Sequence, residues 1–415
     1  MHSDALRDSQ RTSPSCFTRN RKLSFVCVVA YFLSGVRAAV QTELDVFFAV
    51  LRDRAALLQE VSAQALFKAR KGLRGEVFET LNATLMASVQ THFQQPLWHG
   101  LRVVAVDASD VRLTTRCAAR RTIVMAKVLG MYLPGLEMML HAHLYSRDVG
   151  ERQMLFEQMH RLQAGDLTVL DRGYPAAWLA AVFNRMERFF CMRVDSVCGK
   201  VVRDFRRSGL SQAVVELPAP DADDARDYQV PRAPVRVRLI RVVTPGGLVR
   251  VLMTNLLDDG RCPAESFAGL YRQRWRIEEA FKRLKQRLNL ESVSGLGWDT
   301  HVQDLGAKLV CDNLNSLLCL EALAQCGGQA QVDSPTMMLA NQGRLYKINR
   351  TRAFAAVKRC LPRWLQSGVL PQAHEVLELL QQLARNWVEF VPDRMRPRDM
   401  SKTKPHKAFA YKCGG

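Results

Sequence analysis

The sequence has no closely spaced pair of cysteines. Its eleven cysteines are an odd number, none of them forms a Cys-x-x-Cys motif, and they are scattered over 415 residues. Zinc sites and disulfide frameworks both use paired, regularly spaced cysteines, so neither is expected. Isolated free thiols are typical of a reducing compartment, and we therefore expect a cytoplasmic protein.

The sequence also has no apolar run long enough to cross a membrane. The most apolar stretch near the N-terminus, residues 23–36, is shorter than the roughly 20 residues that a transmembrane helix needs. Basic residues precede it and small residues follow it, a pattern that resembles a secretory signal. The alternative is a buried helix of an N-terminal domain. We favour that helix, because export would place the free thiols in an oxidising compartment, and we expect no membrane partner.

The chain has fewer acidic residues than basic ones. The chain has 40 Asp and Glu against 59 Lys and Arg, which gives a formal net charge of +19 and a pI of about 9.8. A charge of this size usually marks a polyanionic partner, and we favour nucleic acid over a membrane surface. The length exceeds that of one compact domain, so two or three domains are expected.

The hydrophobic pattern divides the chain into three parts. Residues 1–100 have apolar residues at helical spacing between basic ones, which predicts a helical N-terminal DNA-binding domain. Residues 101–330 read as three strands, helix, strand, helix, strand, which predicts an α/β fold with a mixed sheet flanked by helices. A β-rich insertion is expected within this part, at about residues 196–251, and residues 331–415 are interpreted as a basic helical C-terminal region.

One stretch, YRQRWRIEEAFKRLKQRL at residues 271–288, combines seven basic residues with two glutamates. Its apolar spacing predicts one long helix. At about 100° per residue, Tyr271, Arg274, Glu278 and Lys285 fall within an arc of roughly 60° beside the apolar face. Glu279 points elsewhere. A solvated face with salt bridges would not sort these four residues into one stripe, so we interpret Glu278 as a carboxylate on a phosphate-binding surface.

Two aspartates stand at points where strands deliver side chains into a site. Asp107 follows the apolar run VVAV, and Asp171 closes the run LTVL and begins a turn. The ends of strands in such sheets are common active-site positions, although an aspartate there is often a turn former. Asp110 is an alternative to Asp107, but strand alternation places it on the opposite face.

Three carboxylates beside basic groups suit metal-dependent phosphoryl transfer. Oxygen ligands are those that Mg²⁺ and Mn²⁺ prefer. Two such ions about 4 Å apart can activate an attacking hydroxyl and stabilise the leaving oxygen. Arginine and lysine on the same surface would hold the phosphates on either side of the scissile bond.

Together these motifs resemble the DDE transposases of the insertion-sequence 4 family, whose catalytic domain is ribonuclease H-like. The family pattern for the third acid is Tyr, two residues, Arg, three residues, Glu, six residues, Lys. It is matched without a gap by Tyr271, Arg274, Glu278 and Lys285. The stretches VDAS and LDRGYP resemble the first and second acid motifs, and the resemblance covers most of the chain.

The resemblance implies cut-and-paste DNA transposition in the bacterial cytoplasm. The protein would cleave double-stranded DNA at terminal inverted repeats and join the ends to target DNA, as a homodimer on DNA. Asp107, Asp171 and Glu278 would be catalytic and would bind two ions of Mg²⁺, with Mn²⁺ as a substitute. Tyr271, Arg274 and Lys285 would bind DNA.

Other functions remain open on the same residues. A transposase-derived DNA-binding protein could keep the fold without the chemistry, and a metal-dependent nuclease of this fold would cut without joining. Tyr271 could also be the covalent nucleophile of a recombinase, but three carboxylates make that role unnecessary.

Overall fold

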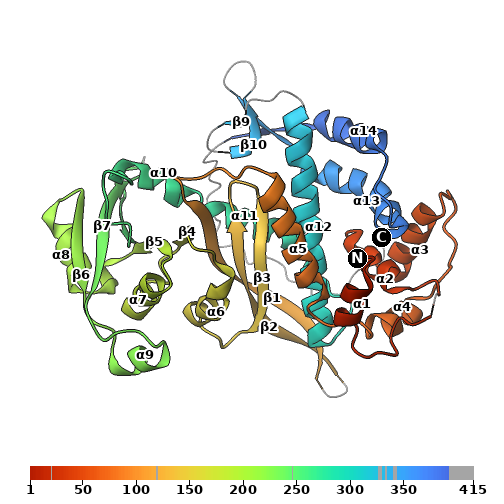
Figure 1. Ribbon diagram of the computed structural model, residues 1–415, viewed down its shortest axis with the longest axis horizontal. Helices are drawn as coiled ribbons and strands as arrows, with labels where there is room; N and C mark the ends of the chain where they lie inside the picture. Colours follow the sequence, from red (N-terminus) through yellow and green to blue (C-terminus); the bar gives the residue numbers. More distant parts are fainter. Residues whose placement is uncertain are drawn as a thin grey trace.

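The computed structural model describes residues 1–19, 21–117, 120–244, 246–325, 330–331, 334–339 and 344–391. Within these ranges the chain is elongated, with the large sheet toward one end and a group of helices at the other (Figure 1).

A mixed eight-stranded sheet, in the order β3-β2-β1-β4-β5-β8-β7-β6, forms the centre of the fold. Its strands are β1 (Arg102–Cys117), β2 (Arg120–Leu133), β3 (Met138–Ser146), β4 (Asp166–Leu170), β5 (Phe189–Val194), β6 (Gln212–Leu217), β7 (Val235–Val243) and β8 (Val249–Thr254). β1 runs antiparallel to β2 and parallel to β4, and β4 runs parallel to β5. This order of the first five strands, with β2 reversed, is the ribonuclease H-like arrangement, so the expected fold class is confirmed.

Residues 196–251 continue this sheet. β8 pairs antiparallel with β5, and β7 and β6 follow it outward. The region also contains two helices, α8 (Lys200–Ser208) and α9 (Ala222–Asp227). The second lies in the polar stretch APDADDARDYQV, residues 219–230. It forms because the side chain of Asp221 accepts a hydrogen bond from the backbone of Asp224 and caps the helix.

The long helix expected at residues 271–288 is broken into α10 (Phe267–Arg272), α11 (Trp275–Lys282) and a π-helical segment, η4 (Arg283–Arg287). Between the first two, the backbone N–H of Arg274 donates to the carbonyl of Tyr271, which is a tighter turn. After α11, the chain continues as the π-helical segment η4, whose turns are wider than those of an α-helix. The prediction of one long helix was therefore wrong, and a uniform 100° step does not relate Tyr271 to Lys285.

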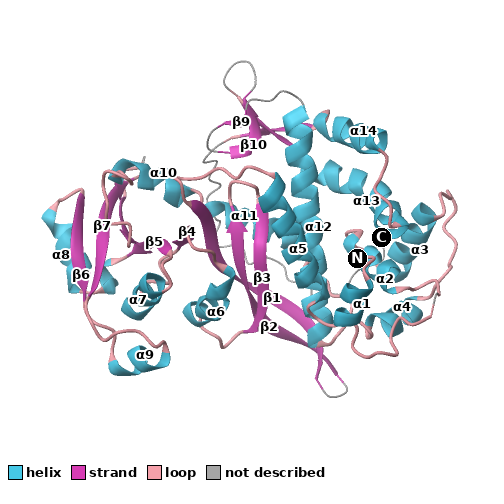
Figure 2. Cartoon of the chain, in the orientation of Figure 1, coloured by secondary structure: helices cyan, strands magenta, loops and turns pink. Residues whose placement is uncertain are grey.

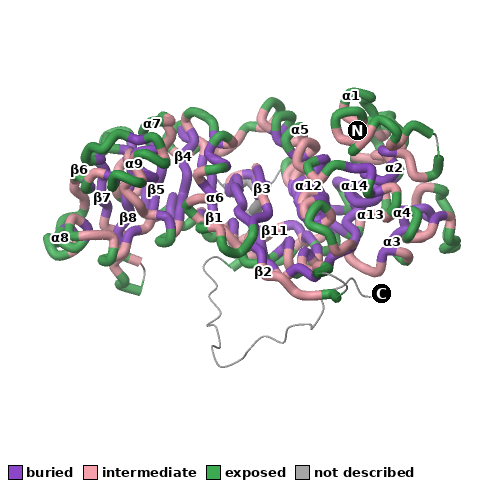
Figure 3. Tube along the Cα trace, turned by 90° about the horizontal axis from the view of Figure 1, so that it is seen from below, coloured by how far each residue is buried: buried purple, intermediate pink, exposed green. Residues whose placement is uncertain are grey.

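Helices cover both faces of the sheet (Figure 2). On one face, α6 (Glu151–Gln158) and α7 (Ala177–Arg185) share an apolar cluster with Val104 of β1. On the other face, Ala105 packs in a cluster with residues of α11 and of α12 (Trp298–Gln325). Successive side chains of a strand point to opposite faces, so the apolar run of β1 serves both layers. The neighbouring strand β4, which pairs with β1, is buried along its whole length (Figure 3).

The regular structure of the first hundred residues is helical. The helices are α1 (Asp4–Gln10), α2 (Phe25–Leu33), α3 (Val40–Leu51), α4 (Ala63–Arg70) and α5 (Val77–His92). α2 is the apolar run noted above, and it is buried in a cluster that includes Ala307 and Val310 of α12. The interpretation as a buried helix is confirmed, and none of the helices described is long and apolar enough to cross a membrane.

The C-terminal part contains a small second sheet in the order β12-β11-β10-β9. Its strands are β9 (Ala330–Gln331), β10 (Ser334–Leu339), β11 (Leu345–Ile348) and β12 (Trp387–Phe390). Two helices, α13 (Arg350–Ser367) and α14 (Ala373–Ala384), pack with α12 in one apolar cluster. The sequence predicted only helices here, because β12 joins β11 across a long separation in the chain. The last part of the basic tail, residues 392–415, lies outside the described residues.

Candidate active site

β1 presents Asp107 on the face of the sheet that α11 covers. Ala105, two residues earlier on the same face, packs in the cluster that contains Ile277 and Phe281 of α11. This packing holds α11 against β1, so Glu278 of α11 comes close to Asp107. The Asp107 side chain is 17% exposed, and its Oδ1 accepts a hydrogen bond from the backbone of Ala108.

Arg274 connects two of the predicted acids. Its Nη1 lies 3.3 Å from Oδ2 of Asp107, and its Nη2 lies 2.8 Å from Oε1 of Glu278. The arginine side chain is only 8% exposed, so the ion pairs form in a partly dehydrated place. The planar guanidinium can serve both carboxylates at once because its N–H groups point in fixed, diverging directions.

Asp171 completes the group from the neighbouring strand. It directly follows β4, which runs parallel to β1 with Ala105 opposite Val169, so Asp171 lies level with Asp107. Asp107 itself, which was expected at the end of a strand, lies inside β1. Oδ1 of Asp171 accepts a hydrogen bond of 2.7 Å from the backbone of Gly173. That bond closes the turn after β4 and holds the Asp171 carboxylate near the end of this strand.

The electrostatics of Asp107 show that the three acids influence one another. Burial raises the pKa of Asp107 to about 7, Arg274 opposes this rise, and the charges of Asp171 and Glu278 add to it. Repelling carboxylates in a partly buried place favour a bound cation. The structure therefore brings together all three acids that the sequence indicated.

A fourth carboxylate, which the sequence analysis missed, belongs to Glu151 at the start of α6. Burial raises the pKa of Glu151, and the charge of Asp171 adds to the rise. A Cβ atom placed on Gly173 would lie 3.1 Å from Oδ1 of Asp171 and 3.3 Å from Oε2 of Glu151, so the two carboxylates flank this glycine. In the sequence, Glu151 looks like an ordinary acid in the first turn of a helix.

Asp107, Asp171 and Glu278 fit a divalent cation by the type of their ligand atoms and by their mutual repulsion. As the side chains stand, however, no three His, Cys, Asp or Glu residues in the described part of the chain are grouped closely enough to hold a metal ion. The partners above explain why: Arg274 engages two of the acids, and the turn engages Asp171.

The residues predicted to bind DNA lie at different depths. Tyr271 is 6% exposed among apolar residues of α10 and β5, and burial raises its pKa to about 12. Arg274 is buried between the acids. Lys285 is only half-buried, and its Nζ donates to the backbone carbonyl of Asp110 on β1. Lys285 thus lies nearer the surface than the other two.

Two tryptophans in this part of the chain are partly exposed. The exposed fraction is 47% for Trp275 and 44% for Trp298. Trp275 faces outward because Ile277 and Phe281 take the inner side of α11. Its ring lies 5.2 Å from the Arg274 guanidinium, close enough for a cation–π contact.

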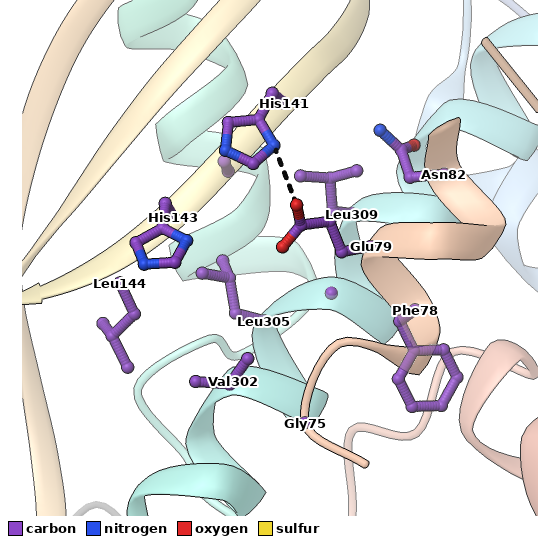
Figure 4. Close-up of a pocket in the computed structure, with 12 residues that line it drawn as sticks. Gly75, Phe78, Glu79, Asn82, His141, His143, Leu144, Val302, Leu305 and Leu309 are labelled. Carbon is purple, nitrogen blue, oxygen red and sulfur yellow. Dashed lines mark ion pairs between the residues drawn. The ribbon is translucent and has the colours of Figure 1, made fainter. Parts of the chain in front are cut away.

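A pocket elsewhere, between α5, β3 and α12, contains His141 and His143 (Figure 4). Nδ1 of His141 lies 3.9 Å from Oε1 of Glu79, which also pairs with Arg161. Burial lowers the pKa of His141 to about 3, so the ring is neutral at ordinary pH. These contacts join α5 to β3 of the large sheet.

Residues 98–314 match the family model of the transposase DDE domain. This range is just over half of the chain, and it includes Asp107, Asp171 and Glu278. The chain belongs to the DDE transposase domain family. Members of this family generally use divalent metal ions, in agreement with the carboxylate group described above.

Similarity to individual proteins is more limited. The chain is 30% identical over 139 residues to "Putative transposase y4zB" of Sinorhizobium fredii. That match spans 32% of this chain and 37% of the relative, so only about a third of the relative is covered. The cryo-electron microscopy structure of a piggyBac transposase synaptic complex with hairpin DNA aligns with 91% of this chain and 80% of that one, at 10% identity. Its TM-score of 0.41 is too low for that likeness to support a conclusion.

Proposed function

We propose that this DDE domain protein is a cut-and-paste transposase of the insertion-sequence 4 family. It would cleave double-stranded DNA at terminal inverted repeats and join the freed ends to target DNA in the bacterial cytoplasm. The observation that carries the proposal is that Asp107 of β1, Asp171 after β4 and Glu278 of α11 lie close enough for their charges to interact, with Arg274 between two of them.

In this proposal the three acids would hold two ions of Mg²⁺, or Mn²⁺ as a substitute. When bound, these ions supply positive charge beside the reacting phosphate. The chain's own cations do the positioning: Arg274 exchanges a carboxylate for a DNA phosphate, and Lys285 holds a neighbouring phosphate. Tyr271, whose ring lies 6.0 Å from the Arg274 guanidinium, keeps that arginine in place and contacts the DNA.

The partners follow from the same chemistry. Cutting both ends of an element and inserting them together requires two active sites, so we propose a homodimer assembled on DNA. The strongly basic chain supports binding to a polyanion.

The experiment that tests the function uses duplexes taken from the DNA on either side of the gene, where terminal inverted repeats are expected. We expect Asp107→Ala, Asp171→Ala and Glu278→Ala each to abolish Mg²⁺-dependent cleavage while end binding persists, because metal ligands act on the transition state more than on ground-state binding. Asp110→Ala and Glu279→Ala are the controls and should cleave normally.

Two outcomes would change the assignment. A variant without one of the three acids that still cleaves at the wild-type rate would remove that residue from the site. Cleavage without strand transfer into a target plasmid would indicate a nuclease of this fold instead of a transposase.

A further inference from the structure

A cavity of about 380 Å³ lies beside α11 and η4, between these segments and β11, β12 and the start of α13. Glu279 lines this cavity, whereas its neighbour Glu278 pairs with Arg274 on the side of Asp107. The cavity is therefore separate from the group of acids, although the same helix contributes to both.

Most of the charged residues that line this cavity are cationic. Five of its residues are Lys282, Arg283, Arg287, Lys347 and Arg350, and the acids that line it are Glu137 and Glu279. Some of the charge is compensated within the wall. Glu137 forms ion pairs with both Lys347 and Arg350, each at an N–O distance of 2.8 Å. Arg283 pairs with Asp312 behind the wall at 3.1 Å.

Counting Asp312 with the lining residues, three carboxylates face five cations, so the cavity keeps a surplus of positive charge. Arg287 lies at the exposed side of this lining. Partial desolvation lowers its pKa, and the like charges of Arg283 and Arg350 lower it further. An anion between these guanidinium groups would remove that repulsion.

The backbone adds to the same field. α13 is an 18-residue helix that begins at the cavity, where Asn349 caps it and Arg350 is its first residue. The N-terminus of a helix carries partial positive charge. Side chains and backbone therefore favour an anion at the same place.

We propose that this cavity is a phosphate-binding site that Arg287 and Lys282 complete when the ligand arrives. Arg283, Lys347 and Arg350 are the preassembled wall, held by Glu137 and Asp312. The phosphate is either a backbone phosphate of DNA or that of a free phosphate compound. The first source rests on the proposed function, and it would fix DNA on the side of α11 away from the acids.

Binding of inorganic pyrophosphate to the full-length chain, measured by calorimetry, tests the site itself. We expect saturable binding to the wild type, and roughly tenfold weaker binding to Arg287→Gln and to Lys282→Gln, because each loses a charge-assisted contact. Arg359→Gln is the matched control: this arginine is exposed on α13, does not line the cavity, and its loss should change nothing. Thermal melts of each variant check that it is folded.

The proposal is overturned if the wild type binds no pyrophosphate, or if Arg287→Gln binds it as well as the wild type does. It is also overturned if Arg359→Gln weakens binding equally, because general charge would then explain the effect.

A second measurement distinguishes the two sources of phosphate. For binding to a DNA duplex across a salt series, loss of one phosphate contact should lower the log–log slope by about 0.9. A lower slope for Arg287→Gln identifies a DNA phosphate. An unchanged slope together with lost pyrophosphate binding identifies a free phosphate compound. Neither result depends on cleavage, so failure of the acid variants to behave as proposed would leave this site standing.

Discussion

Arg274 reaches across 167 positions of the sequence to Asp107, with 3.3 Å between Nη1 and Oδ2. The arginine therefore stabilises the charged form of an aspartate that burial and two neighbouring acids would otherwise protonate. Arg274 thereby supplies positive charge beside both Asp107 and Glu278. Several predictions rest on this contact and on the groups around it, each with its own measurement.

Removing Arg274 should slow cleavage and move its pH dependence upward. Because Arg274 lowers the pKa of Asp107, Arg274→Ala leaves that carboxyl protonated to higher pH. We expect cleavage to fall at least tenfold near neutral pH and to recover in part above about pH 8. The control is Arg276→Ala, because Arg276 Nη1 donates to the carbonyl of Pro134, just after β2. A pH–rate profile that shifts equally in both variants would contradict the role of Arg274.

Replacing Asp107 should raise stability while it abolishes activity. The folded pKa of about 7 exceeds the ordinary value of 3.8, so the folded state keeps a proton that the unfolded chain has lost. Wild-type stability therefore falls as pH rises from about 4 to about 7. Asp107→Asn lacks this loss, so its Tm relative to wild type should increase through that window and stay constant above it. Melts in the presence of a chelator measure this difference, and a constant difference at all pH values would show that Asp107 has an ordinary pKa.

Glu151 should tune the affinity for divalent ions. Its carboxylate lies beside Asp171, so Glu151→Gln removes one negative charge from the site without a change in size. We expect the Mg²⁺ concentration for half-maximal cleavage to rise roughly tenfold, with the rate at saturating Mg²⁺ largely kept. Glu157→Gln, in the last turn of the same helix, is the control. If the two variants need the same Mg²⁺ concentration, Glu151 plays no part in binding.

Lys285 should contact a DNA phosphate. It is less buried than Tyr271 and Arg274, and its Nζ donates to the carbonyl of Asp110 on β1, the strand that carries Asp107. We expect Lys285→Ala to weaken binding of an end duplex and to lower its log–log salt slope by about 0.9. Fluorescence anisotropy across a salt series measures this slope, with Arg276→Ala as the reference. Identical slopes for the two variants and the wild type would remove Lys285 from the DNA surface.

The contact between α4 and α12 should be important for stability. Arg70 is 2% exposed and pairs with Asp304 at 3.1 Å, while its other N–H groups donate to Ser294, Gln303 and the carbonyl of Thr300. Asp304→Ala would leave a buried guanidinium without its counter-charge, at a cost of about 3–5 kcal/mol. Denaturant unfolding should show this loss. Asp299→Ala, in the exposed first turn of α12, should cost less than about 0.5 kcal/mol, and equal costs would mean that the pair is not important.

Local pattern was enough for the elements that depend on neighbouring residues. The apolar runs before Asp107 and Asp171 predicted β1 and β4. Asp171 directly follows β4 as expected, whereas Asp107 lies inside β1, which continues to Cys117. The spacing of Ile277 and Phe281 predicted which side of α11 packs on the sheet, and this side placed Glu278 correctly. Alternation of side chains along a strand and the 3.6-residue turn of a helix are properties of the backbone, so the sequence carries them directly.

Relationships between distant segments were decided by the tertiary structure. Where the chain turns tightly between α10 and α11, packing of Tyr271 in one cluster and Ile277 in another replaces the regular helix that local spacing favours. Glu151 became part of the site only because α6 packs across β1 and β2. Arg274, a residue predicted to bind DNA from its place in a motif, lies buried between two acids because burial makes each unpaired charge costly and nearby opposite charges relieve it. The sequence by itself thus determined which groups are present and on which face of each element they lie. Their partners depend on the distances and dehydration that folding creates.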